Sequence, residues 1–314
     1  MKEQPNLIIN NNIPKSFLKG KYKKNSLVIR NFLKKLKTNI DKNEDAFYTL
    51  SKNYKFYFSK KKLAKYKKFK TIIIIGMGGS ILGAKAIYSF MQHKIKKNFI
   101  FFDNLEEKKI HNIIKNKKIE KPFFLIISKS GNTIETLINL NLLNNYKSNA
   151  SNTILITEKS NNTLVDYSKK NKIPIIEHRK YIGGRYSVLS EVGMVPAYLM
   201  GFKIANFRKN ILKYFENKNQ KKFTKNTSEI CNIYLSKKIN SIIFLDYSHN
   251  LKNFLYWAQQ LLAESLGKNK LGLMPFISLA PKDHHSLLQL YLDGPKDKIF
   301  YIFSSKNLYD YKTS

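Results

Sequence analysis

The sequence predicts an α/β protein with two doubly wound parallel sheets behind a helical arm. From Thr71 onward, short apolar β-branched runs alternate with amphipathic segments, the pattern of βα units around a buried parallel sheet. A second series of the same kind begins near Ser241. The length of 314 residues also favours two domains over one.

The first series follows a polar, Lys-rich stretch over residues 1–66, in which we expect a helical arm with an amphipathic helix from Ser26 to Leu36. The expected strands of the first domain, residues 67–186, are Thr71–Ile75, Phe99–Asp103, Phe123–Ser128, Thr153–Thr157 and Ile173–Ile176. Such a sheet binds ligands beyond the carboxyl ends of its strands.

The second series lies in residues 187–314, after a helix at 190–201 and a Lys/Asn-rich connection at 208–226. A helix from Asn253 to Leu266 is expected to end at Gly267. The expected strands are Ser241–Asp246, Gly272–Ser278 and Lys298–Phe303. Because about two strands fewer are readable than in the first sheet, we expect an incomplete second domain with an exposed edge and an uncovered apolar face on the 253–266 helix.

Composition places the chain among globular proteins. Hydrophobic residues make up 43% and aromatics 13%, enough for a packed core, and no apolar run approaches the roughly 20 residues of a membrane span. The N-terminus lacks the pattern of a signal peptide. The single cysteine, Cys231, cannot form an intrachain disulfide, so we expect a reducing, cytoplasmic setting.

The formal net charge of +36 suggests a polyanionic partner, but its distribution argues against one. Lysines are spread over the whole chain, and no nucleic-acid-binding motif accompanies them, so we interpret them as solvated surface residues. Only four basic residues are arginines: Arg30, Arg179, Arg185 and Arg208. Arg185 is therefore of interest as a rare planar, bidentate donor.

Two loops after predicted strands are suited to binding an anion. The first, GMGGS at 76–80, opens a helix and resembles a dinucleotide loop, except that bulky Ile81 stands where small residues are needed. The second, SKSGNTIET at 128–136, gathers four hydroxyl side chains around one strand-to-helix turn, although Thr133 and Thr136 can equally cap a helix. Two such loops at adjacent strand ends favour a sugar-phosphate pocket over a dinucleotide crevice.

Three further motifs complete a recognisable order: GGRYS at 183–187, Q-x-x-x-ESLGK at 260–268 and HHSLLQ at 284–289. With the two loops they resemble the bacterial type of glucose-6-phosphate isomerase, a family of two sugar-isomerase (SIS) domains, over roughly residues 70–300. The resemblance implies a cytoplasmic, homodimeric isomerase of glycolysis and gluconeogenesis that needs no cofactor. It interconverts glucose 6-phosphate and fructose 6-phosphate through a cis-enediol.

The resemblance also assigns roles. It implies that the phosphate is held by Ser128, Ser130, Thr133, Thr136 and the backbone of Lys129. The other implied positions are Gly79 and Ser80 lining the sugar, Gln260 contacting it, Arg185 stabilising the enediolate, Glu264 as the base, and His285 opening the ring from the neighbouring subunit.

The residues themselves suit this chemistry. One carboxylate can carry a proton between adjacent carbons, a fixed cation stabilises the developing oxyanion, and an imidazole suits proton transfer to a ring oxygen. Glu264, Gln260 and Trp257 fall on one helix face, where Trp257 is expected to lower the polarity around the carboxylate. His284 is a lesser rival to His285, no metal site is expected, and four other histidines have no supporting pattern: His93, His111, His178 and His249.

The family's C-terminal segment, with its ring-opening lysine and a substrate-contacting glutamine, has no counterpart after Pro295. We therefore expect the chain alone to be poorly soluble or partly unfolded and to have little isomerase activity. Three other functions remain open: a bifunctional phosphoglucose/phosphomannose isomerase, which GGRYS and ESLGK argue against, a non-catalytic SIS-domain sensor of sugar phosphates, and a basic nucleic-acid binder.

Overall fold

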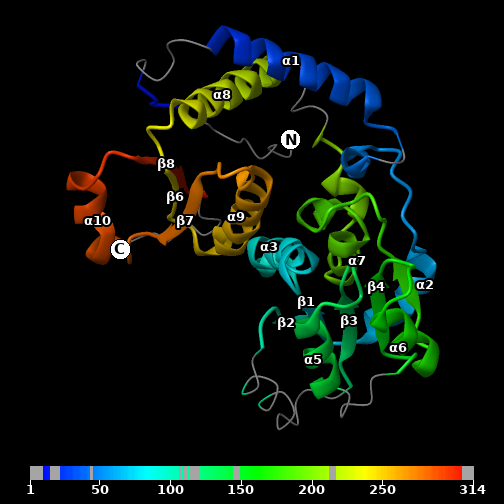
Figure 1. The fold of residues 1–314 in the computed structure, drawn as a ribbon. Helices are drawn as coiled ribbons and strands as arrows, with labels where there is room; N and C mark the ends of the chain where they lie inside the picture. Colours follow the sequence, from blue (N-terminus) through cyan, green and yellow to red (C-terminus); the bar gives the residue numbers. More distant parts are fainter. Residues whose placement is uncertain are drawn as a thin grey trace.

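The structure, a computed structural model, contains two parallel sheets with helices α3 and α9 packed between them (Figure 1). It describes residues 10–14, 22–42, 45–105, 108, 112, 121–143, 149–211 and 217–305. The α-helices are α1 Tyr22–Asn39, α2 Lys60–Ala64, α3 Leu82–Met91, α5 Ile134–Leu143, α6 Thr163–Asn171, α7 Glu191–Leu199, α8 Asn217–Ser236, α9 Lys252–Leu266 and α10 His284–Asp293. None of the helices in these ranges combines the length and the apolar character needed to cross a membrane.

Short 3-10 helices join several of these elements. They are η2 Ala46–Leu50, η3 Lys65–Lys68, η4 Gly78–Ser80, η5 Gln92–Lys94, η7 Gly184–Leu189, η8 Ile204–Phe207 and η10 His249–Leu251. Two of them, η4 and η7, carry motif residues and pack against each other.

The first sheet has the order β2-β1-β3-β4-β5, with all strands parallel. Its strands are β1 Thr71–Gly76, β2 Asn98–Phe102, β3 Phe123–Ile127, β4 Thr153–Thr157 and β5 Ile175–Glu177. Side chains of β1 alternate between two cores: Ile72 and Ile74 pack with α3 and α7, whereas Ile73 and Ile75 pack with α5 and α6. Burial on both faces explains the continuous apolar runs in the sequence.

The second sheet repeats the first half of this topology with the order β7-β6-β8, again parallel. Its strands are β6 Ser241–Asp246, β7 Met274–Leu279 and β8 Lys298–Phe303. The predicted fold class, two parallel sheets with a partial second one, is confirmed. The predicted boundary at residue 186 stays a prediction, and α7, which we counted with the second domain, packs on the first sheet.

Two predicted strands begin too early. The strand expected from Ile173 starts at Ile175 because Lys172 adopts a left-handed conformation at the end of α6 and Ile173 N–H bonds back to the Ser168 carbonyl. The strand expected from Gly272 starts at Met274, since Gly272 has a φ of +151° and still belongs to the turn after α9.

The prediction of a Lys/Asn-rich connection at 208–226 was also wrong in part, because residues 217–236 form the helix α8. This helix packs against α1 in the predicted arm (Figure 1). Part of the contact is polar: Ser228 lies 3.3 Å from Ser26 through their hydroxyls, and Asn25 donates to the amide oxygen of Asn232. A helix stabilised through such a face shows little apolar periodicity in its sequence.

Helices α9 and α10 lie on opposite faces of the second sheet (Figure 1). Leu255 and Leu262 of α9 pack with Tyr301 on one face, whereas Tyr291 of α10 packs on the ring of Phe300 on the other. Parallel strands joined by right-handed crossovers in opposite directions produce this arrangement.

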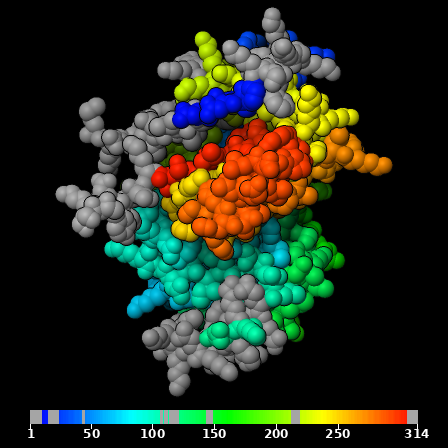
Figure 2. Space-filling model, turned by 90° about the vertical axis from the view of Figure 1, so that its left-hand side faces the viewer, coloured from blue at the N-terminus to red at the C-terminus, as the bar shows by residue number. Residues whose placement is uncertain are grey.

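The uncovered apolar face that we expected on α9 lies elsewhere. Helix α9 packs against α3, and Leu255 is fully buried. The exposed apolar side chains of the second sheet are instead on β7, β8 and α10, which project at the surface in Figure 2; they include Phe276, Leu292 and Ile302.

A buried polar cluster attaches the N-terminal residues to the start of α7. The fully buried carboxylate of Glu191 accepts a hydrogen bond from the Tyr54 hydroxyl at 2.7 Å and one from the Tyr57 backbone N–H at 2.9 Å. Arg208 donates to the carbonyls of Thr49 and Leu189, which brackets the same junction. The cluster therefore fixes both ends of the turn between η7 and α7.

Tyr54→Phe is expected to lower the free energy of unfolding by about 1.5 to 3 kcal/mol, because a buried carboxylate loses a charge-assisted hydrogen bond. Urea unfolding followed by circular dichroism measures the change. Tyr57→Phe is the matched control, since Tyr57 reaches Glu191 through its backbone and its ring is half exposed. Equal effects of the two substitutions would contradict the assignment.

Candidate active site

The two anion loops leave neighbouring strands at the same edge of the first sheet. Strands β1 and β3 are paired in parallel, with Gly76 opposite Ile127, so GMGGS and SKSGNTIET begin side by side. The strand order reverses at β1, and ligands of doubly wound folds bind at this reversal. The predicted neighbourhood of the two loops is confirmed.

The hydroxyl loop, residues 128–133, is closed by its own side chains. The hydroxyls of Ser128 and Thr133 lie 2.9 Å apart, and the Ser128 hydroxyl accepts the N–H of Gly131 at 3.1 Å. Gly131 has a φ of +69°, and a Cβ there would fall 1.9 Å from the side-chain oxygen of Asn162. Only glycine fits this turn.

The loop leads into α5, whose first turn is held at the same edge. Ser130 is exposed, Thr133 is half-buried, and Thr136 is fully buried. Among the described residues, the Thr136 hydroxyl has no hydrogen-bond partner. The loop thus combines three hydroxyl side chains with a helix N-terminus, a combination that suits a multi-oxygen anion.

The GGRYS motif forms η7 and packs directly on the GMGGS loop. A Cβ on Gly79 would lie 2.2 Å from the Gly184 carbonyl carbon and 2.7 Å from the Arg185 nitrogen. The Ser187 hydroxyl lies within hydrogen-bond distance of two carbonyls, 3.1 Å from that of Gly79 and 2.6 Å from that of Gly184. The GMGGS and GGRYS motifs are therefore in direct backbone-to-backbone contact at Gly79 and Gly184.

Arg185 extends from η7 to the C-terminal part of α9. Its Nε donates to the Ser265 hydroxyl at 3.0 Å, and its Nη1 lies 3.5 Å from Oε2 of Glu264. The hydroxyl of Tyr186 also contacts Ser265, at 3.1 Å. This hydrogen bond, with the neighbouring guanidinium, lowers the pKa of Tyr186.

Trp257 and Gln260 share the α9 face with Glu264, as predicted, but Trp257 does not shield the carboxylate. Its indole N–H donates to the Arg185 carbonyl at 3.1 Å, while the Glu264 side chain is 52% exposed. Gln260 lies against Gly78 of the first loop, and its amide oxygen is buried with no partner among the described residues.

Sequence reasoning missed Ser265 and Tyr186, which orient Arg185. Both lie inside motifs that we had quoted, so position next to a proposed catalytic residue was the available signal. Sequence reasoning also missed the burial of Arg179 and Arg208, which are 6% and 5% exposed. The rarity of arginine in a chain rich in solvated lysine was the available signal for these two residues.

His285 is far from this cluster. It is exposed at the start of α10, beyond the carboxyl end of β7, whereas Glu264 precedes β7 and lies on the other face of the sheet. Its neighbour His284 is bound to the Tyr247 hydroxyl at 2.8 Å. His93 is exposed, His249 begins η10, and His111 lies outside the described residues.

His178 is the only histidine that is buried within the described ranges. It is 2% exposed, its Nδ1 lies 3.2 Å from the Arg179 carbonyl, and its Nε2 has no partner there. Burial, aided by the nearby Lys129 ammonium, lowers the pKa of His178 to about 4. The imidazole is therefore neutral in the folded protein near pH 7.

The fold agrees with comparisons to known proteins. Residues 24–272, most of the chain, match the family model described as phosphoglucose isomerase. The chain belongs to the phosphoglucose isomerase family.

Relatives of this family support the assignment at the sequence level. Glucose-6-phosphate isomerase of Methanocaldococcus jannaschii is 36% identical over 253 residues, covering 78% of this chain and 63% of the relative. The Campylobacter jejuni enzyme is 32% identical over 240 residues, covering 73% of this chain and 59% of its own length. The chain thus spans about six-tenths of these phosphoglucose isomerases.

Solved structures share the fold. A hypothetical protein from Thermus thermophilus aligns with a TM-score of 0.71 at 22% identity, covering 92% of this chain and 74% of that one. A glucose-6-phosphate isomerase from Chlamydia trachomatis aligns at 0.55 and 21% identity, covering 93% and 56%. At these identities the likeness concerns the fold alone.

Gly79→Ala is expected to force the two phosphoglucose isomerase motifs apart, because its methyl group would overlap the Gly184 carbonyl. Overpacking of this kind lowers the free energy of unfolding by about 1 to 3 kcal/mol. Trp257, the one tryptophan of the chain, donates to the Arg185 carbonyl, so its fluorescence should shift in the same variant. Gly184→Ala is the control, since its Cβ would meet nothing closer than 3.8 Å; identical behaviour of both variants would refute the close contact.

The buried neutral His178 makes stability fall in mild acid. The unfolded chain binds a proton on this residue below about pH 6.5, whereas the folded chain does so only near pH 4. The stabilisation is therefore complete above pH 6.5, and about 2 kcal/mol of it is lost between pH 7 and pH 5. Urea unfolding at both values should show a smaller loss for His178→Gln than for the parent. His93→Gln, at an exposed position, should keep the parental dependence; the same slope in all three would refute the prediction.

Proposed function

We propose that this protein interconverts glucose 6-phosphate and fructose 6-phosphate through a cis-enediol. The observation that carries the proposal is the convergence of Arg185 with Ser265 and Glu264 beside the GMGGS loop. A rare, oriented guanidinium next to a half-exposed carboxylate is the pair that proton transfer beside a carbonyl requires.

The substrate's phosphate is proposed to sit in the hydroxyl loop. Ser128, Ser130 and Thr133, the backbone of Lys129 and the buried hydroxyl of Thr136 surround the start of α5, and donors of this kind favour a dianion. The sugar would then extend past Gly79 and Ser80 towards Gln260, whose buried amide oxygen has an unused acceptor site. Unphosphorylated hexoses should bind far more weakly.

The chemistry then needs three groups. His285 is proposed to protonate the ring oxygen as the C1–O5 bond breaks, while the anomeric hydroxyl releases its proton to water and C1 becomes the carbonyl. The carboxylate of Glu264 removes the proton from C2 of the aldose, and the guanidinium of Arg185 stabilises the negative O1 of the enediolate. The O2 hydroxyl proton then moves to O1, and Glu264 returns its proton to C1 to give the ketose. The same carboxyl group accepts and donates the proton and exchanges it with solvent in between, and neither step transfers a hydride or an electron to a cofactor.

Two copies of the chain are proposed to share each site. Glu264 precedes β7 and His285 follows it, and a strand of six residues is about 20 Å long. The helices that carry the two residues also lie on opposite faces of the sheet, with Tyr301 facing α9 and Phe300 facing α10. A second copy can supply His285 to this site, as a symmetric dimer requires.

Complementation between two inactive variants tests both the reaction and its sharing. Glu264→Gln and His285→Ala should each lower the rate of deuterium incorporation from solvent at C1 of fructose 6-phosphate by about 10²-fold or more. After the two are unfolded together and refolded as an equal mixture, about a quarter of the parental rate should return, because half of the dimers then contain one complete site.

Each alternative outcome has a distinct meaning. No recovery in the mixture would show that the two residues do not act across chains. No deuterium incorporation by the parent even when the family's C-terminal segment is supplied in trans, together with tight binding of the sugar phosphate, would favour the sensor function. Equal affinity for fructose and fructose 6-phosphate in calorimetry would refute the phosphate assignment.

A further inference from the structure

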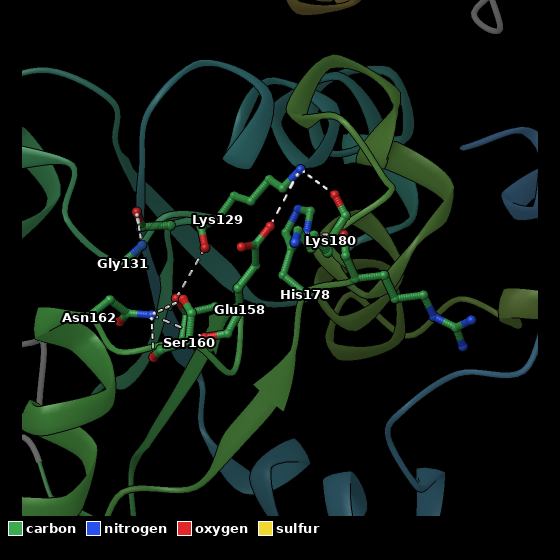
Figure 3. Close-up of polar contacts among 10 residues, drawn as sticks. Lys129, Gly131, Glu158, Ser160, Asn162, His178 and Lys180 are labelled. Atoms are coloured by element: carbon green, nitrogen blue, oxygen red, sulfur yellow. Dashed lines mark hydrogen bonds and ion pairs between the residues drawn. The ribbon is translucent and has the colours of Figure 1, made fainter. Parts of the chain in front are cut away.

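Lys129, the one charged residue of the hydroxyl loop, turns its ammonium away from that loop. Its Nζ donates to the Lys180 carbonyl at 2.7 Å and lies 3.5 Å from Oε1 of Glu158. Figure 3 shows the side chain running from the loop towards Lys180 and His178, on the side away from Gly131. The Lys129 and Glu158 side chains are only 32% and 21% exposed, so the pair is partly shielded from water.

The backbone of Lys129 holds the same neighbours. Its carbonyl accepts the N–H of Glu158 at 3.1 Å and lies 3.4 Å from the Thr157 hydroxyl, which joins the loop to the end of β4. The neutral ring of His178 lies beside the ammonium (Figure 3), and the backbone N–H of His178 donates to the Thr157 carbonyl at 2.8 Å. The ammonium therefore has a carbonyl and a carboxylate as partners, and the neutral imidazole beside it adds no second positive charge.

Lys180 lies in the short segment that leads to Arg185. A turn closes over it, with the Ile182 N–H donating to the Arg179 carbonyl at 3.1 Å. Arg179 is itself buried, bound to the Tyr181 hydroxyl at 2.6 Å and to the Lys55 carbonyl. The chain then enters η7, where Gly184 packs on Gly79. Only the four residues 181–184 separate Lys180 from Arg185 along the chain.

We infer that Lys129 is a positioning residue, whose ammonium ties the hydroxyl loop to the segment carrying Arg185 and does not bind the substrate phosphate. The inference rests on the proposed function for the roles of the loop and of Arg185. The bond from Lys129 to Lys180 then fixes the position of a phosphate in the loop relative to the guanidinium that stabilises the enediolate. If the ammonium moved to the phosphate, the Lys180 carbonyl and the Glu158 carboxylate would both lose a partner.

Three variants distinguish a positioning role of Lys129 from direct binding of the phosphate. Lys129→Met removes the ammonium while keeping the length of the side chain, and Lys129→Arg keeps a cationic donor. Lys159→Met is the matched control, because Lys159 pairs with Glu177 at 2.9 Å on the same side of the sheet, is 66% exposed, and lies outside the loop. The probe is glucitol 6-phosphate, which has no carbonyl and so cannot be isomerised.

Two measurements on these variants do not depend on turnover. In calorimetry, Lys129→Met should bind glucitol 6-phosphate within about threefold of Lys159→Met, since both lose one positive charge near the site. In hydrogen exchange, the amides of residues 179–187 should exchange about tenfold faster in Lys129→Met than in Lys159→Met, and Lys129→Arg should restore most of the protection. Where fructose 6-phosphate is turned over, Lys129→Met should lower kcat about tenfold with KM within threefold.

Opposite results would overturn the inference. Binding weakened about tenfold or more by Lys129→Met relative to Lys159→Met, with unchanged exchange at 179–187, would make Lys129 a phosphate ligand. If Lys129→Met does not fold, Glu158→Gln gives the same decision: affinity for glucitol 6-phosphate should stay within about threefold, and a tenfold gain would mean that the freed ammonium binds phosphate. Failure of the proposed isomerase reaction is separate, because it would appear as absent turnover in the parent with the exchange and binding results intact.

Discussion

The candidate site depends on the close contact of Gly79 with Gly184 and Arg185, where the first loop leaves no room for a side chain at Gly79. The first loop ends a strand of the first sheet, and the second carries Arg185 to Ser265 and Glu264 on α9. Helix α9 belongs to the second sheet, so this contact joins the two sheets at the candidate site. The α3 and α9 helices pack beside it and keep the approach fixed.

Much of the first sheet could be predicted because its signals are local. A strand buried on both faces must be apolar throughout, and β1, β3 and β4 are runs of that kind. Glycines at 79 and 131 mark positions where backbone or a neighbouring side chain comes too close for a Cβ. The motif residues around Arg185 and Glu264 were therefore recognisable before their contacts were known.

The features that escaped prediction depend on partners distant in the sequence. Helix α8 has a Lys/Asn-rich sequence, and its order comes from α1, about 200 residues earlier. Glu191 is buried because Tyr54 and the Tyr57 backbone supply its hydrogen bonds, and no pattern around Glu191 itself indicates that burial. The Lys129 side chain is similar: in a chain with 57 basic residues, one lysine has no mark that distinguishes a structural partner from a solvated charge.

The topology of the second sheet is the reason that the proposed reaction would need more than one chain. A parallel βαβ unit places its helix on one face, and the next crossover, in the opposite direction, places the following helix on the other. Residues at the end of α9 and the start of α10 are consequently separated by the full length of β7 as well as by the thickness of the sheet. No side chain can span that separation, so a reaction that uses Glu264 and His285 together needs the α10 of another copy. The topology that builds the site around Arg185 thereby also imposes assembly on the chemistry that we propose for it.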